Sequence, residues 1–356
     1  MSSRFALVPS AALALACALP AHAAGIDFAP TANIQYDVVR FDADDARLRD
    51  DDAFRRARLG FKAKAGRWQF VAEHDFADRT PADAYVEFAP AKGHGLRLGQ
   101  FKQPFSLEDA ISDKQAPFLE TSLLGTYAIS RRLGLEYART GERAMLNVAA
   151  FGQRLDGTME GRGVTARGAW VVARTAGSLL QVGGSLAADA PDASRASFSA
   201  SPGTALSPTR IGASGTLAGV DRIDRGAIEA LWLHGAASLQ AEWGRVHVRR
   251  DLRPDFATDA HSVVATWSPT GHARAWKRGV PGSPTGANGA WELAARWSAI
   301  DLDDAGIAGG RVRSVGLAAS YFPNPHLRIA ANVVRTSRAG GADAPLLAAL
   351  RVQLTY

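Results

Sequence analysis

The sequence predicts an all-β fold: a transmembrane antiparallel β-barrel of about 16 strands. Three observations lead to this prediction. They are an N-terminal export signal, apolar and polar residues that alternate along almost the whole chain, and a fully alternating last segment that ends in Tyr356. Alternate side chains of a strand point to opposite faces, so this pattern separates an apolar face from a polar one. A barrel strand needs only ~9–11 such residues to cross a bilayer.

The first residues have the features of a secretory signal. Arg4 precedes an apolar run that reaches Leu19, and Ala21-His22-Ala23 is a small-x-small cleavage motif. We therefore expect residues 1–23 to be a signal peptide and residues 24–356 to form one barrel domain. The single cysteine, Cys17, lies inside this signal, so the exported chain is expected to contain no disulfide.

Sixteen alternating segments can be distinguished, and single-chain bacterial barrels have an even number of strands. The segments are Phe28–Phe41, Asp52–Lys64, Arg67–Ala77, Ala82–Phe88, Gly95–Lys102, Arg131–Arg139, Glu142–Phe151, Gly163–Ala173, Ser178–Ala188, Arg222–Leu233, Ala236–Val248, Asp259–Trp267, Ala290–Ile300, Arg311–Phe322, His326–Thr336 and Leu346–Tyr356.

The connections between these segments are alternately short, as at Ala65-Gly66, and long, as at 103–130 and 301–310. Short periplasmic turns and long outer loops are typical of such barrels. The segment 269–289 is an exception, because it is long and basic but falls on the short side. Either the strand count is wrong there or this turn folds into the lumen.

The segment 56–64 places its bases on one face only. Arg56, Arg58, Lys62 and Lys64 share one side of the strand, and the other side is apolar. This pattern suits a wall with lipid on one face and an aqueous channel on the other. The chain has 41 basic and 35 acidic residues, a formal charge of +6. Nucleic-acid binding is disfavoured because the bases are dispersed and the protein is exported.

The same alternation places eight acids on the lumen side against eleven bases, namely the four of segment 56–64 and seven further ones. The seven further bases are Arg97, Arg132, Arg167, Arg225, Arg296, Arg328 and Arg351. Rings or ladders of Arg and Lys select anions in pores, and the planar guanidinium suits phosphate oxygens. We expect Arg56, Arg58, Lys62 and Arg132 to reach the constriction, helped by Lys102 and Lys114 from the long loop region.

The sequence contains no convincing catalytic motif. The eight histidines show no metal-like pairing, so we expect neither a metal nor a cofactor. A hydrolase arrangement of His74, Asp75 and Ser106 is conceivable, but the alternation places His74 on the outward face. We therefore expect a channel and not an enzyme.

Several segments resemble the phosphate-selective porin O/P family of Gram-negative outer membranes. They include FRRARLGFK (54–62), LRLGQFKQPFSLE (96–108), SRRLGLEY (130–137), YFPNPHLRIAANVVR (321–335) and LRVQLTY (350–356). The resemblance implies a trimeric porin in contact with outer-membrane lipid. It also implies a third loop that folds inward, and ladders of arginine and lysine that conduct phosphate or polyphosphate.

By this resemblance, Arg55 and Arg56 match the paired arginines of the family, and Lys102 and Lys114 lie in the inward loop region. The stretch 195–215 is rich in Ala, Ser, Gly and Pro and has few bases. A general, weakly anion-selective porin for small anionic solutes therefore remains the alternative to a phosphate channel.

Overall fold

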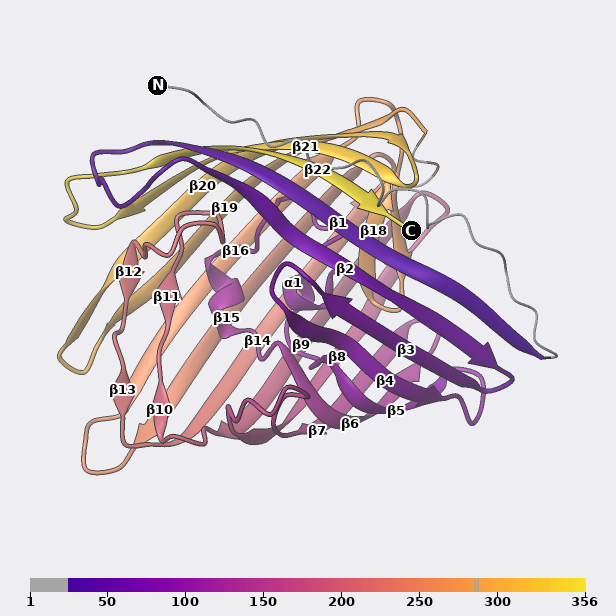
Figure 1. Ribbon diagram of the computed structural model, residues 1–356, viewed down its shortest axis with the longest axis horizontal. Helices are drawn as coiled ribbons and strands as arrows, with labels where there is room; N and C mark the ends of the chain where they lie inside the picture. The colour runs from indigo at the N-terminus through magenta and orange to yellow at the C-terminus, as the bar shows by residue number, and fades with distance from the viewer. Residues whose placement is uncertain (1–24, 285, 287) are drawn as a thin grey trace, which may run out of the picture.

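A computed structural model describes residues 25–284, 286 and 288–356. Sixteen antiparallel strands form a closed barrel in which sequence neighbours pair, and β1 pairs with the last strand, β22 (Figure 1). The barrel strands are β1 Ile26–Asp42, β2 Asp51–Ala65, β3 Trp68–Asp75, β4 Thr80–Phe88, β5 His94–Lys102, β6 Arg131–Thr140, β7 Ala144–Phe151, β8 Arg162–Arg174, β9 Ser178–Ala190, β14 Val220–His234, β15 Ala237–Arg250, β16 Phe256–Trp267, β19 Ala290–Asp304, β20 Ile307–Asn324, β21 Leu327–Arg338 and β22 Leu346–Thr355. Each expected segment overlaps one of these strands, so the predicted barrel is confirmed. The expected signal peptide lies outside the described residues.

The seam between β1 and β22 closes the barrel. Its register runs from Asn33 opposite Thr355 to Asp42 opposite Leu346. Asp37 and Arg351 face each other across the seam inside the lumen, and the guanidinium donates to both carboxylate oxygens, at 2.6 and 2.7 Å. Closure leaves no unpaired strand edge, as a bilayer requires.

The outer face of the barrel is apolar. Leu98, Leu186 and Leu317 have exposed fractions of 60%, 72% and 64%. Aromatic rings lie near the short-turn end, where Trp291 stacks on Tyr321 with centroids 4.9 Å apart. An apolar band with aromatic residues at its border is typical of barrels that face lipid. Among the described residues, no helix is long and apolar enough to cross a membrane.

The exceptional turn 268–289 folds into the lumen, which is the second of the two expected possibilities. It contains the hairpin β17 Arg274–Lys277 and β18 Val280–Pro284. The carbonyl of Gly279 in this hairpin accepts hydrogen bonds from the inward side chains of Arg167 and Gln181. The strand count is therefore correct on both sides of the turn.

The expectation of a long loop at 301–310 is wrong. β19 and β20 continue as a hairpin to a two-residue turn, Ala305-Gly306, with φ values of 48° and 80°. A type I′ turn requires such positive φ values at both positions. The acidic residues looked like a loop, but Asp301 faces Arg311 across the hairpin, with a 2.9 Å ion pair.

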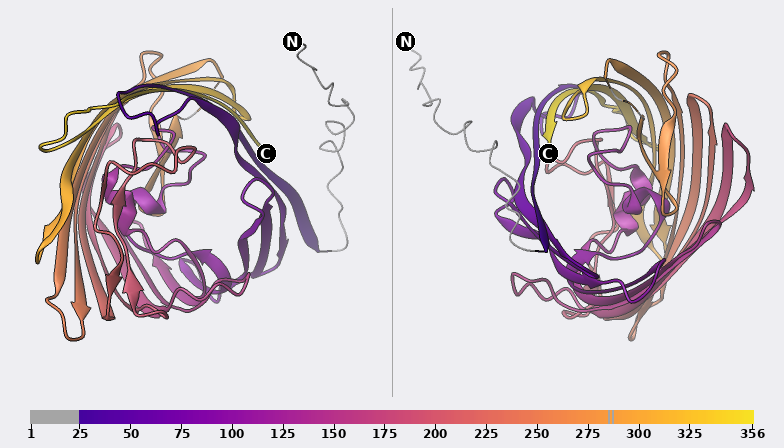
Figure 2. Two further views of the ribbon diagram at one scale, coloured as in Figure 1. Left: turned by 60° about the vertical axis from the view of Figure 1, so that its left-hand side comes forward. Right: turned by 90° about the vertical axis from the view of Figure 1, so that its right-hand side faces the viewer.

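Two long loops fill part of the barrel interior. Loop 103–130 contains α1 Leu107–Ala110 and the 3₁₀ helix η1 Leu123–Tyr127, and Figure 2 shows α1 within the barrel outline. Loop 191–219 forms two short ladders, β10 Arg195–Ala196 with β13 Leu217–Ala218, and β11 Ser199–Ala200 with β12 Gly212–Ala213. The ring of Phe198 lies between Tyr127 and Phe256, at centroid distances of 6.0 and 6.3 Å. An apolar core thus joins both loops to the wall.

We predict that Arg351→Ala destabilises the barrel far more than a surface change. The substitution leaves Asp37 buried without its counter-charge, which costs about 3–5 kcal/mol in comparable cases. Denaturant unfolding in detergent micelles measures the difference. The control is Arg311→Ala, whose guanidinium is exposed and should contribute less than ~1 kcal/mol. Equal losses in the two variants would contradict the prediction.

Candidate functional site

Arg55, Arg56 and Arg58 of β2 all have partners in the lumen, although strict alternation would send Arg55 outward. The register of β1 and β2 shifts at this point: Gln35 faces Arg56, and the next residue, Tyr36, faces Phe54. Arg55 is therefore the extra residue of a β-bulge, which redirects side chains locally. The bulge brings two adjacent arginines to the lumen side.

These three arginines bind carboxylates of loop 103–130. Arg55 binds Glu120 at 2.7 Å, whereas Arg56 and Arg58 both bind Asp113, at 2.7 and 2.6 Å. Arg58 also binds Asp75 of β3 at 2.8 Å. The basic row of β2 therefore holds the loop as well as lining the lumen.

Other wall arginines bind the backbone of the same loop. Arg296 donates to the carbonyl of Glu120 at 2.7 Å, Arg274 to that of Gln115 at 2.6 Å, and Arg351 to that of Leu119 at 2.9 Å. Arg328 donates to the carbonyls of residues 116 and 117, at 2.8 and 3.1 Å. Buried loop carbonyls need such partners because water is excluded there. The alternation predicted that Arg296, Arg328 and Arg351 point inward, but it could not show that they bind a loop.

Glu242 of β15 fixes the start of the loop from the opposite wall. Its carboxylate accepts from the backbone N–H groups of Leu107 and Glu108, at 2.7 and 2.9 Å. Glu108 in turn accepts from the backbone and hydroxyl of Ser122, at 2.8 and 2.6 Å. Loop 103–130 is thus attached along its length and can act as a fixed constriction.

The remaining predicted site residues divide into paired and unpaired bases. Arg97 binds Glu87 at 2.8 Å, Lys102 binds Asp109 at 3.3 Å, and Arg132 binds Glu160 at 2.6 Å. Within the part of the chain that the structure describes, no carboxylate pairs with the other three, Lys62, Lys64 and Lys114. Lys114 instead donates to the carbonyl of Ala32 at 3.4 Å.

Three adjoining cavities form a path along β2–β6, which we call the pore path. The first, of about 250 Å³, is lined by Arg55, Arg56 and Arg58. The second, of about 330 Å³, shares Lys102, Asp113 and Arg131 with the first and adds Arg97. The third, of about 760 Å³, shares Arg278 and Glu87 with the second. The path leads from the inward loop to the periplasmic turns.

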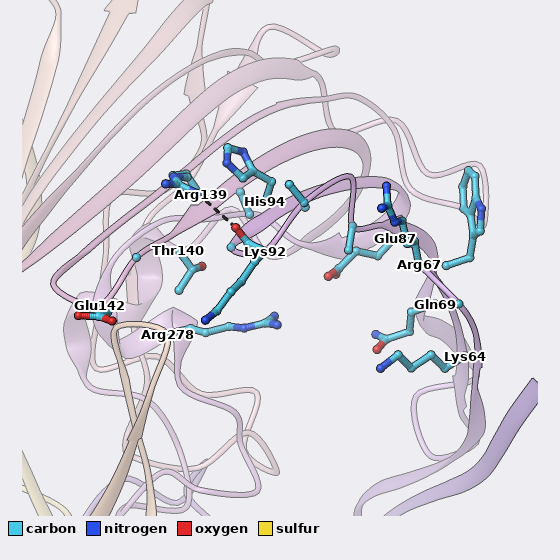
Figure 3. A pocket seen from close by; sticks show the side chains of 18 residues that line it. Lys64, Arg67, Gln69, Glu87, Lys92, His94, Arg139, Thr140, Glu142 and Arg278 are labelled. Carbon is cyan, nitrogen blue, oxygen red and sulfur yellow. Dashed lines mark hydrogen bonds between the residues drawn. The ribbon is translucent and has the colours of Figure 1, made fainter.

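The third cavity, which we call the vestibule, lies at the short-turn end and is strongly basic. Figure 3 shows Lys64, Lys92 and Arg278 reaching into it. Arg67 and Arg139 also line it and donate to the backbone carbonyls of residues 90 and 92. No ion pair to a carboxylate involves these five bases among residues 25–284, 286 and 288–356.

The structure does not bring every predicted residue to the pore path. Arg132 turns to Glu160 of the 152–161 loop and lines none of the three cavities. Lys62 and Lys114 also lie outside their linings. The structure adds Arg131, which binds Asp83 at 2.8 Å and lines two of the cavities. Arg131 is the first residue of its strand, where alternation gives little guidance.

The loop carboxylates are ionised by their neighbours. Burial opposes ionisation of Asp113, but Arg56 and Arg58 outweigh it and hold the pKa of this carboxyl well below its usual range. Burial likewise opposes ionisation of Glu120, and Arg55 and Arg56 overcome it, so this pKa is also lowered. Burial lowers the pKa of Lys114. The loop therefore presents fixed negative charges to the arginines of β2.

A closed barrel of 16 strands, apolar outside, polar inside and narrowed by an inward loop, defines a porin-type channel of an outer membrane. Residues 28–356 match the family model of the phosphate-selective porins O and P. The chain belongs to this family. No curated protein matches the sequence significantly.

Solved porins share the fold at low sequence identity. A loop-deletion mutant of OmpT from Vibrio cholerae is 11% identical, with a TM-score of 0.64 over 93% of this chain and 100% of that one. OmpF of Salmonella typhi is 13% identical, with a TM-score of 0.60 over 93% and 98%. An anion-selective porin from Comamonas acidovorans is 11% identical, with a TM-score of 0.57 over 93% and 100%.

We predict that Asp113→Asn increases anion preference. The change removes one negative charge and frees two guanidinium groups at the first cavity. A unit charge about 8 Å from a passing ion contributes ~0.5 kcal/mol in water, with opposite signs for an anion and a cation, so the anion-to-cation permeability ratio should rise about five-fold. Reversal potentials in a KCl gradient measure this ratio. Asp192→Asn, in the exposed part of loop 191–219, is the matched control. An unchanged or lower ratio in Asp113→Asn would contradict the prediction.

The lowered pKa values of Asp113 and Glu120 predict how the channel responds to acid. Groups with depressed pKa values stabilise the loop fully above the ordinary carboxyl pKa, about 4, and lose this contribution as pH falls below it. The difference in single-channel conductance between the unchanged protein and Asp113→Asn should therefore stay constant from pH 7 to pH 5 and diminish only in stronger acid. A midpoint between pH 5 and pH 7 would argue against this assignment.

Proposed function

We propose that this porin is an anion-selective channel through which phosphate and polyphosphate diffuse passively. The observation that carries the proposal is the excess of bases in every cavity of the pore path. Six bases and four acids line the first cavity, five bases and four acids the second, and five bases and two acids the vestibule. The low-dielectric barrel wall focuses this positive field and raises the local concentration of anions.

The paired arginines suit weak and repeated binding. A guanidinium has five N–H donors, so Arg56 or Arg58 can hold Asp113 and still offer donors to a passing oxyanion. Sharing with a carboxylate weakens each anion contact. Conduction needs sites that bind well enough to admit an ion but release it to the next one. We propose that anions move from these arginines past Lys102 and Arg97 to the vestibule.

A general, weakly anion-selective porin for small anionic solutes is the second candidate. Its support is the same pairing: Asp113 and Glu120 neutralise much of the arginine charge at the first cavity. A channel with strict phosphate selectivity would keep more of these guanidinium groups free.

We propose that the channel resides in a Gram-negative outer membrane as a homotrimer. Family membership and the barrel support the location. One solved relative of the fold, OmpT of Vibrio cholerae at 12% identity, is described in a trimer form.

The decisive experiment is electrical recording from the purified protein in planar bilayers. The reversal potential in a KCl gradient should show anion preference, and millimolar phosphate should reduce the chloride current if the pore binds phosphate. Chloride current that phosphate leaves unchanged would favour the general porin. Preference for cations would overturn both candidates.

The vestibule provides a sharper test of the basic pore path. Arg278→Gln should lower the anion-to-cation permeability ratio about five-fold, because the same ~0.5 kcal/mol at 8 Å acts with opposite signs on the anion and the cation. Lys277→Gln is the matched control, because Lys277 belongs to the same hairpin but lines none of the three cavities. Equal effects of the two substitutions would show that overall charge, and not the vestibule, sets the preference.

A further inference from the structure

Two arginines lie next to each other on the outer, lipid-facing surface of the barrel. Arg313 of β20 and Arg335 of β21 are exposed, and the residues that alternate with them are buried on the lumen side. Arg313 faces Ser337, and Val315 faces Arg335, so the two arginines are diagonal neighbours. Such neighbours are about 7–8 Å apart, within reach of two long side chains.

These two arginines differ from three other outward bases at the same end of the barrel. Arg245 binds Asp259 at 3.3 Å, Arg311 binds Asp301 at 2.9 Å, and Arg222 binds Asp224 at 2.7 Å. Neither Arg313 nor Arg335 has a carboxylate partner in the described residues. Two like charges side by side destabilise a sheet unless an anion lies between them.

The pair is located where the apolar outer surface ends, on the long-loop side. Toward the periplasm, the outward positions of β20 are Val315, Leu317 and Ala319, and those of β21 are Val333, Ala331 and Ile329. Trp297 of β19 lies in the same cross-strand row as Val315 and Arg335. A charge here costs only ~0–1 kcal/mol, whereas it would cost ~2–4 kcal/mol at the midplane. This is the level of the outer-leaflet headgroups.

We propose that Arg313 and Arg335 bind the phosphate of an anionic glycolipid headgroup in the outer leaflet. Two guanidinium groups can grip one phosphate through paired, charge-assisted hydrogen bonds. The acyl chains of the same lipid then lie on the apolar rows that contain Val315, Leu317 and Val333. The apolar surface directly below the arginines favours a lipid over free phosphate. This site is independent of the proposed transport, because both side chains point away from the lumen.

The experiment uses the full exported chain, folded in detergent micelles. Diphosphorylated lipid A should raise its thermal unfolding temperature, and dephosphorylated lipid A should raise it much less. The double variant Arg313→Gln/Arg335→Gln should bind diphosphorylated lipid A at least about ten-fold more weakly in the same titration. Its conductance and permeability ratio should equal those of the unchanged protein, which verifies that the barrel is folded.

The matched control is Arg245→Gln/Arg311→Gln, which removes two outward bases that already have carboxylate partners and should retain lipid A binding. Three results would overturn the proposal. They are equal lipid A binding by the test variant and the unchanged protein, an equal thermal shift with inorganic phosphate alone, or a change in oligomer size of the test variant without lipid. The second would indicate a simple anion site, and the third a contact between protein copies.

Discussion

Burial of guanidinium groups inside a closed barrel is the constraint on which this structure depends. A barrel wall has only two faces, and lipid excludes charge from one of them. Arginines at the depth of the lipid tails must therefore lie inside, where each needs acceptors. Loop 103–130 supplies these as carboxylates and backbone carbonyls. Arg351 shows the link most directly, because it binds Asp37 across the closing seam and the carbonyl of Leu119 in the loop.

The lumenal bases consequently serve two different purposes. Arg274 and Arg328 are buried and hold the loop backbone, so an anion can reach them only if the loop moves. In the part of the chain that the structure describes, Lys64, Lys92 and Arg278 of the vestibule have no such partner and face the cavity, where they can attract anions. The position of the loop and the field in the channel thus depend on partly different residues, and Arg56 and Arg58 contribute to both. A pore can in this way combine a rigid constriction with weak ion binding.

The alternation of apolar and polar residues could predict the strands and whether most side chains point to the lipid or to the lumen, because both follow from one repeating geometry. It could not predict which residue each inward side chain binds. Arg132 lies on the inward face of its strand, as expected, yet it binds Glu160 and lies away from the pore path. Arg55 reaches the lumen because of a β-bulge, which only the pairing of β1 with β2 reveals. The hairpin at 301–310 was not predicted because its acidic residues are typical of a loop. Only the structure shows that Arg311 lies opposite Asp301 and pairs with it.

The base-poor stretch 195–215 has a structural explanation that bears on selectivity. Loop 191–219 packs Phe198, Ala200 and Leu217 into an apolar core with the inward face of β14–β20. Basic side chains there would be buried without water, at a cost of several kcal/mol each. This core fills one side of the lumen and leaves the opposite side, along β2–β6, for the pore path. The scarcity of bases in this stretch therefore follows from its packing, although Ser199, Thr204 and Arg210 also line a cavity of about 240 Å³ that adjoins the first cavity of the pore path at Glu120 and Thr121.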